Sequence, residues 1–119
     1  MYYFKLISLK GCPYSQASEE LFKNQKIKHE LVQIDYTEKQ KYKSDNITTF
    51  PQIYLKKKYS KGSVLVGGYE DIKEYFDLIN ESNTDVDKKI LNFKNILNKK
   101  IPDISEKSIL RLVELLNKN

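Results

Sequence analysis

Strand-like and helix-like segments alternate along the first two-thirds of the chain, and their order constrains the fold more than any other feature. Short apolar runs predict strands, and apolar residues at helical spacing predict helices. A loop over 60–63 would let the last two strands pair antiparallel. The order β-α-β-α-β-β-α is typical of an α/β sandwich with helices on both faces of a small mixed sheet. In chain order the pattern predicts strand 3–9, helix 15–24, strand 31–34, a short polar helix 38–44, strand 51–55, strand 64–66 and helix 70–80.

After a polar break, the rest of the chain contains two further amphipathic segments. Pro102 ends the first, and Asp103 with Glu106 three residues later predicts a capping box that opens the second. The wide apolar side of this last helix must bury against the domain itself, a second subunit or another protein. We therefore expect a domain over 1–80 and a helical extension over 81–119. The first segment is defined by Ile90, Phe93, Leu97 and Ile101.

Composition narrows the possible classes of protein. The 119 residues carry a net charge of +5, and no run approaches the roughly 20 apolar residues that cross a bilayer. Lysines are scattered, and the one compact run, 56–58, more often forms a solvated hairpin tip than a nucleic-acid site, so the sequence weighs against nucleic-acid binding. A single cysteine forms no intramolecular disulfide, which fits a reducing, cytoplasmic compartment.

Cys12, the only cysteine, lies where the first predicted strand ends and the first predicted helix begins. Pro13 suits the first turn of a helix, so Cys12 would lie at the helix N-terminus, where unpaired backbone N–H groups and the macrodipole favour an anion. The thiolate is the reactive form of cysteine, and Lys10 would add positive charge nearby. The alternative is a small buried residue. The strand–Cys–Pro–helix context favours a reactive thiol.

Three short motifs each lie at an expected strand or helix edge: Cys12-Pro13-Tyr14-Ser15, Thr49-Phe50-Pro51 and Gly67-Gly68-Tyr69-Glu70-Asp71. Together they resemble the signatures of glutaredoxins. The resemblance covers about residues 1–80 and implies a thioredoxin-type fold, glutathione binding and thiol exchange with glutathione mixed disulfides. Ser15 stands where dithiol members have a second cysteine, which implies a monothiol mechanism through Cys12.

The resemblance also implies how glutathione would bind. A cis peptide before Pro51 would turn the backbone of Phe50 toward Cys12, so that the tripeptide could pair with it as a short strand. An ordinary trans proline opening a strand is the alternative, and the chain departs from the family by having phenylalanine where valine is common. The N–H groups after the glycine pair would hold the γ-glutamyl carboxylate, with Asp71 matching the acidic residue of the motif.

At the opposite end of the tripeptide, Lys10 would approach the glycyl carboxylate, with Lys39 or Gln40 as substitutes for the family's basic or amide residue. Tyr14 would pack beside the tripeptide, and the Ser15 hydroxyl would contact the thiolate or cap the helix. The expected glutathione-binding set is Lys10, Tyr14, Thr49, Phe50, Pro51, Gly68, Tyr69, Glu70 and Asp71, and the supporting residues around Cys12 are Lys10, Pro13, Tyr14 and Ser15.

Two other functions remain open. In an iron–sulfur dimer, two Cys12 thiolates and two glutathione thiolates would ligate a [2Fe–2S] cluster, although the specialised carriers have Cys-Gly-Phe-Ser and a Trp-Pro segment, and this chain has no tryptophan. Within one chain, Cys12 and His29 do not make a closed metal site. In the second alternative, the domain is a scaffold, and the helices within 84–119 contact a partner or a second copy.

Overall fold

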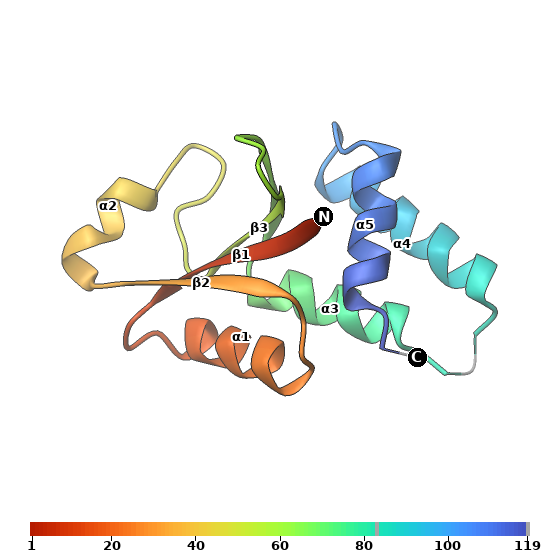
Figure 1. Ribbon diagram of the computed structural model, residues 1–119, viewed down its shortest axis with the longest axis horizontal. Helices are drawn as coiled ribbons and strands as arrows, with labels where there is room; N and C mark the ends of the chain where they lie inside the picture. Colours follow the sequence, from red (N-terminus) through yellow and green to blue (C-terminus); the bar gives the residue numbers. More distant parts are fainter. Residues whose placement is uncertain (83, 119) are drawn as a thin grey trace. The chain divides into compact units, whose positions relative to one another are not determined.

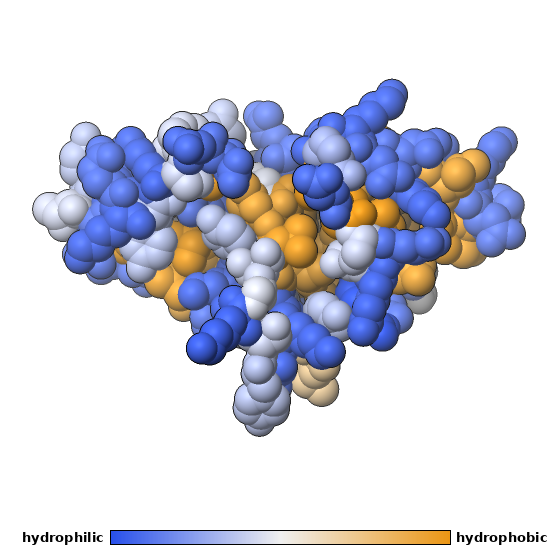
Figure 2. All heavy atoms as spheres, turned by 90° about the horizontal axis from the view of Figure 1, so that it is seen from above, coloured by the Kyte–Doolittle hydropathy of each residue, from blue (hydrophilic) through white to orange (hydrophobic). Residues whose placement is uncertain are grey.

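The computed structural model describes residues 1–82 and 84–118; Asn83 and Asn119, which fall in the predicted helical extension, lie outside the described residues. The chain forms two compact units, Met1–Ile72 and Lys73–Asn119. Their boundary falls inside a helix, and the predicted domain boundary at residue 80 stays a prediction. No helix among the described residues is long and apolar enough to cross a membrane. Hydrophilic residues cover most of the face seen in Figure 2, with smaller apolar patches between them.

The first unit is built on a four-stranded mixed sheet with the order β2-β1-β3-β4 (Figure 1). The central strand β1 runs parallel to β2 and antiparallel to β3, and β3 and β4 form the predicted antiparallel pair. The predicted α/β class and element order are confirmed. The elements are β1 (Tyr2–Leu9), α1 (Pro13–Asn24), β2 (His29–Ile34), the 3-10 helix η1 (Tyr36–Glu38), α2 (Lys39–Tyr42), β3 (Gln52–Lys57), β4 (Ser63–Gly67) and the first turn of α3 (Tyr69–Ile79).

Helix α1 packs on one face of the sheet through its buried side. Pro13 occupies the first turn, where its missing N–H leaves no hydrogen bond unmade. Phe22, three turns along the helix, stacks on Phe4 of β1 with ring centroids 5.4 Å apart, and both side chains are fully buried. This contact holds the C-terminal part of α1 against the first half of β1, and the bond from the Leu9 N–H to Ser15 Oγ holds the start of α1 against the end of β1.

A second apolar cluster lies on the other face, around Ile7, Ile34 and Phe50, with Tyr42 of α2 packed against it. The predicted helix over 38–44 begins and ends two residues earlier than expected. It consists of η1 followed by one turn of α2, and it ends at Tyr42 because Lys43 has an extended backbone. The side chain of Tyr42 is the part of this polar segment that reaches the apolar cluster.

The second unit contains the rest of α3 together with α4 (Val86–Lys100) and α5 (Glu106–Leu116). Tyr75 of α3 meets Phe93 of α4 edge-on, with ring centroids 5.4 Å apart, and both residues are fully buried. The exposed ion pair of Lys94 with Glu106, at 2.8 Å, joins α4 to α5. The remaining buried apolar residues of α4 and α5 are Leu97, Ile109, Leu112 and Leu116.

The prediction that Asp103 caps the last helix is wrong. The N-cap is Ser105, whose hydroxyl accepts the backbone N–H of Ser108 at 3.1 Å. The N–H of Ile104 donates to the carbonyl of Ile101, so Asp103 lies within a turn between the helices. A helix capped by Asp103 would have to begin at Ile104, but Ile104 belongs to this turn and α5 begins at Glu106.

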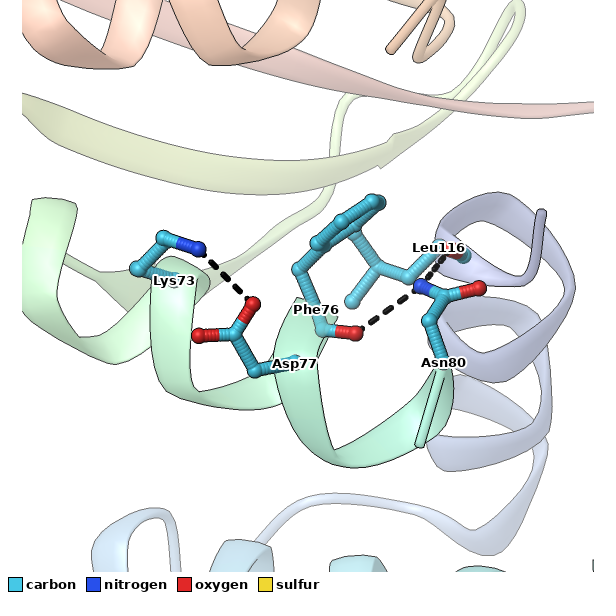
Figure 3. Close-up of polar contacts among 5 residues, drawn as sticks. All are labelled: Lys73, Phe76, Asp77, Asn80 and Leu116. Atoms are coloured by element: carbon cyan, nitrogen blue, oxygen red, sulfur yellow. Dashed lines mark hydrogen bonds and ion pairs between the residues drawn. The ribbon is translucent and has the colours of Figure 1, made fainter. Parts of the chain in front are cut away.

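Asn80 fastens the end of α3 to the end of α5 (Figure 3). Its Nδ2 donates to the carbonyl oxygens of Phe76 and Leu116, both at 2.8 Å, and its Oδ1 accepts the N–H of Lys118 at 2.7 Å. Backbone groups at a helix end need such partners when they are shielded from water. The last helix therefore packs against α3 of its own chain, one of the three partners that the sequence left open.

Candidate functional site

Cys12 is the N-cap residue of α1, with an extended backbone at φ −89° and ψ 120°, as the sequence predicted for a residue between strand and helix. Its carbonyl accepts the N–H of Gln16 at 3.0 Å, which begins the helical ladder. The side chain is half-buried, and its Sγ donates a hydrogen bond to the carbonyl oxygen of Phe50 at 3.7 Å. The thiol thus lies at a helix N-terminus and against the segment that precedes β3.

The segment opposite the thiol is 49–51. The peptide bond between Phe50 and Pro51 is cis, and both residues are buried, whereas Thr49 is exposed. The Phe50 side chain belongs to the apolar cluster with Ile7 and Ile34, which leaves its backbone carbonyl turned to Cys12. This arrangement presents a peptide edge beside the thiol.

The glycine pair lies next to Pro51. A Cβ on Gly68 would come within 3.6 Å of the Pro51 carbonyl oxygen, and a Cβ on Gly67, whose φ is +138°, would come within 2.3 Å of Asp71 Oδ2. The Gly68 N–H donates to Asp71 Oδ2 at 3.0 Å, so Asp71 organises the first turn of α3. Backbone N–H groups at such a helix start can receive a carboxylate. The side chain of Glu70, also in this turn, is exposed.

A contact between two aromatic rings joins the start of α3 to the segment that carries the thiol. Tyr14, two residues after Cys12, has its ring centroid 6.4 Å from that of Tyr69 at the start of α3. Tyr14 is 56% exposed, so its ring borders the solvent beside the thiol. The structure therefore brings the three sequence motifs together through successive contacts, from Cys12 to Phe50, from Pro51 to Gly68, and from Tyr69 to Tyr14.

Ser15 is buried, and its Oγ accepts the backbone N–H of Leu9 at 3.0 Å. The sequence placed this hydroxyl near the thiolate or at the helix cap, and the structure shows it bonded to the end of β1. No side-chain hydrogen bond caps α1 at Cys12. Ser15 therefore connects the strand to the helix that carries the thiol.

Lys10 is not one of the residues in the three contacts that bring the motifs together. Its Nζ pairs with Asp35 at 3.3 Å, and about three-fifths of each side chain is exposed, 59% and 60%. Nearby, Glu38 accepts the Asp35 N–H at 3.1 Å, and Lys39 Nζ lies 4.6 Å from the Tyr36 ring centroid. The sequence did not identify Asp35, because its approach to Lys10 depends on the parallel pairing of β1 with β2.

Comparison with known proteins decides the family. The glutaredoxin family model matches residues 1–60, half of the chain. The chain belongs to the glutaredoxin family. A solved structure, glutaredoxin 1 from Francisella tularensis complexed with cacodylate, is 25% identical, with a TM-score of 0.52 over 66% of this chain and 96% of that chain. The comparison with curated proteins found no match.

Membership of the glutaredoxin family assigns a thioredoxin-type fold, with a C-terminal helical extension, and a function of the thiol–disulfide oxidoreductase kind. Glutaredoxins generally use glutathione. Residues 1–82 and 84–118 contain no group of three or more potential metal-ligating side chains. Sequence reasoning missed the ring contact between Tyr69 and Tyr14, which no local pattern reveals because it joins segments 55 residues apart (69 minus 14).

Proposed function

We propose that this glutaredoxin reduces glutathione mixed disulfides by a monothiol mechanism through Cys12. The observation that carries the proposal is the contact between Cys12 Sγ and the Phe50 carbonyl, with the Gly68 turn directly beside Pro51. A nucleophile, a peptide edge and a helix N-terminus then lie within one site. A tripeptide thiol with carboxylates at both ends fits this combination.

Each part of glutathione has a candidate partner. Its backbone would pair with Phe50 as a short added strand, and its γ-glutamyl carboxylate would face the N–H groups at the start of α3. Tyr14 would border the bound tripeptide from the solvent side. An exposed ion pair contributes little in water, so Lys10 could leave Asp35 for the glycyl carboxylate at small cost.

The chemistry consists of two thiol–disulfide exchanges. In the first, the Cys12 thiolate attacks the glutathione sulfur of the mixed disulfide, the S–S bond breaks, and the substrate thiolate leaves and takes a proton. In the second, the thiolate of a second glutathione attacks the glutathione sulfur on Cys12. This releases oxidised glutathione and regenerates the Cys12 thiolate. The net reaction converts one mixed disulfide and one free glutathione into the reduced substrate thiol and one molecule of oxidised glutathione.

Ser15 limits the reaction to this path. A second thiol at this position could attack the mixed disulfide on Cys12, but a hydroxyl forms no disulfide. With one cysteine in the chain, release of glutathione from Cys12 needs a thiol from solution. A reducing, cytoplasmic compartment, which would supply glutathione, belongs to the same proposal.

Turnover of a glutathionylated peptide, with glutathione as reductant, tests the proposal. We expect turnover by the wild-type protein and only the uncatalysed rate for Cys12→Ser. A peptide carrying cysteine in place of glutathione on the same thiol is the matched substrate, and it should react much more slowly because it lacks the γ-glutamyl and glycyl groups. Full activity of Cys12→Ser, or equal rates on the two peptides, would contradict the proposal.

A glutathione-ligated [2Fe–2S] dimer is a second candidate, favoured by the accessibility of the half-buried Cys12 thiol and by the absence of a competing thiol. Cys12 from each of two copies would hold the cluster together with two glutathione thiolates. Anaerobic incubation with iron, sulfide and glutathione should then yield a coloured dimer, and Cys12→Ser should stay colourless. A colourless monomer from the wild-type protein would dismiss this candidate.

A further inference from the structure

Tyrosine and lysine side chains alternate on one face of the sheet. In the pairing of β1 with β3, Tyr3 lies opposite Lys56, and Lys5 lies opposite Tyr54. Residues opposite one another on paired strands share a face, as do residues two apart along a strand. These four side chains therefore form a pattern in which each tyrosine has a lysine directly across from it.

This end of the sheet face is accessible to a ligand. Tyr42 of α2 and Tyr54 of β3 both pack against the cluster around Ile7, whereas Tyr3 lies toward the other end of β1. Tyr3, Lys5, Tyr54 and Lys56 are each half-exposed. The Tyr54 hydroxyl is uncharged at neutral pH and does not repel an anion, because the ordinary pKa of tyrosine is 10.0 and partial burial raises it further.

The turn between β3 and β4, part of the green hairpin in Figure 1, also carries tyrosine and lysine side chains. Tyr59 in this turn is 97% exposed and has a φ of 66°, a region that bulky residues rarely adopt. Lys58 Nζ lies 5.3 Å from the Tyr59 ring centroid, and Lys57 and Lys61 are exposed. The turn thus presents an aromatic ring to solvent, and three lysines lie within two residues of this ring in the sequence.

The segments that form this surface carry lysines, and one carboxylate, Glu30, lies beside Lys5 on the same face. Residues 1–18 and 46–69, which contain β1, β3 and β4, include lysines but no aspartate or glutamate. Glu30 belongs to β2, the other neighbour strand of β1. A ligand along β1, β3 and the turn would therefore meet mainly positive charge, which complements a chain of phosphates.

We propose that a tyrosine–lysine surface, formed by Tyr3, Lys5, Tyr54, Lys56 and the turn 57–61, binds single-stranded nucleic acid. Bases would stack on the tyrosine rings, and phosphates would pair with the lysines, a combination that tolerates many sequences. Lysines alone would attract any polyanion, whereas the interleaved rings favour a ligand with flat bases. From the sequence alone the compact lysine run 56–58 favours a solvated hairpin tip, and the strand pairing adds Tyr3 and Lys5 beside it.

The turn 57–61 is the part of this surface that lies far from the thiol site, whereas Tyr54 packs against the cluster that contains Phe50. Tyr2, at the start of β1, pairs with Lys57, whereas Cys12 follows the end of β1. The eight residues of β1 span roughly 25 Å at the usual rise of a strand. Variants of the turn should therefore leave Cys12 chemistry unchanged.

Fluorescence anisotropy of labelled oligouridine and oligothymidine of about 12 nucleotides tests the proposal on the full-length protein. Combined Lys57→Gln, Lys58→Gln and Lys61→Gln substitutions should weaken binding about tenfold or more and lower the salt slope by about 2. The matched control carries Lys88→Gln, Lys99→Gln and Lys107→Gln, the same charge change on exposed lysines of α4 and α5, and should alter binding less than about twofold.

Tyr59→Asn separates stacking from charge, because asparagine tolerates positive φ but has no ring to stack. We expect it to weaken binding by about fivefold or more at unchanged salt slope. No binding by the wild-type protein, equal losses in both triple variants, or an unaffected Tyr59→Asn would overturn the proposal. Tighter binding to phosphatidylserine vesicles than to either oligonucleotide would assign the surface to lipid instead and would also overturn it.

Discussion

At the scale of single residues, Ser15 has a structural task that its position in the motif does not reveal. Its Oγ is the acceptor for the partly buried N–H of Leu9. Ser15→Ala leaves that N–H without this acceptor, and we expect the free energy of unfolding to fall by about 1–3 kcal/mol. Turnover per folded molecule should change little, because the hydroxyl carries no step of the proposed exchange.

Ser18→Ala is the matched control for this prediction. Ser18 is also buried in α1, but its hydroxyl donates to the Tyr14 carbonyl within the same helix. Such a bond adds little to a helix, so we expect a loss below about 0.5 kcal/mol. Urea unfolding of both variants measures the difference. Equal losses would show that the bond between Leu9 and Ser15 has no special weight.

Gly67 is the second residue whose replacement should be costly. An alanine there would have a φ of +138° and would place its Cβ 2.3 Å from Asp71 Oδ2. We expect Gly67→Ala to destabilise the protein by about 1–3 kcal/mol and to raise the KM for glutathione, because Asp71 must move away from the Gly68 N–H. Gly62→Ala is the control, since only Ser60 Oγ lies near, at 3.9 Å. An unchanged KM for Gly67→Ala would count against the glutathione site at this turn.

At the scale of secondary structure elements, the ion pair between α4 and α5 makes stability depend on pH. The hydrogen bond and the charge of Lys94 lower the pKa of Glu106 below its ordinary value of 4.5. The stabilisation is therefore complete above 4.5 and disappears as the pH falls through the lower pKa of the folded protein. Glu106→Gln should lower the thermal midpoint at about pH 7 and have a smaller effect at about pH 3.

Lys94→Gln is the partner control, because it removes the other half of the same pair. Its destabilising effect should fade over the same pH range. Differential scanning calorimetry of the three proteins at both pH values makes the comparison. A loss for Glu106→Gln that is the same at both pH values would mean that this pair does not hold the two helices together.

The elements could be predicted from the sequence where local pattern decides them. Apolar spacing and Pro13 identified β1 and α1, and the three motifs identified the thiol, the peptide edge and the glycine turn. The cap of α5 was mispredicted because Asp103 and Ser105 are both good capping residues, and the turn at Ile101 selects between them. The contacts of Lys10 with Asp35 and of Tyr14 with Tyr69 depend on strand pairing and helix placement, which no local pattern contains.

At the scale of the whole molecule, one helix belongs to both units. The N-terminal turn of α3 contains Asp71, which bonds to the Gly68 N–H. The later turns of α3 pack with α4 and α5 through Tyr75 and Asn80. A chain that ends at Ser82 would lose Phe93 and the other buried side chains of α4 and α5. We expect it to lose several kcal/mol of stability, at about 1.5–3 kcal/mol for each large apolar side chain, and to bind glutathione more weakly.

Single substitutions in the full-length chain check this expectation without truncation. Phe93→Ala should cost about 3–5 kcal/mol because the side chain is fully buried against Tyr75. Leu91→Ala, at a position on the same helix that is 56% exposed, should cost less than about 0.5 kcal/mol. If the truncated chain has the same thermal midpoint of unfolding as the wild-type protein and keeps full activity, the extension is an accessory for a partner or a second copy.

In the proposed mechanism glutathione, and not the substrate, becomes attached to the Cys12 sulfur. Intact-mass spectrometry after a single exchange with a glutathionylated peptide, before any free glutathione is added, measures this directly. We expect a protein heavier by one glutathionyl group, located at Cys12 and removed by added glutathione, with the peptide released in reduced form. A peptide adduct on Cys12, or an unmodified protein, would contradict this mechanism.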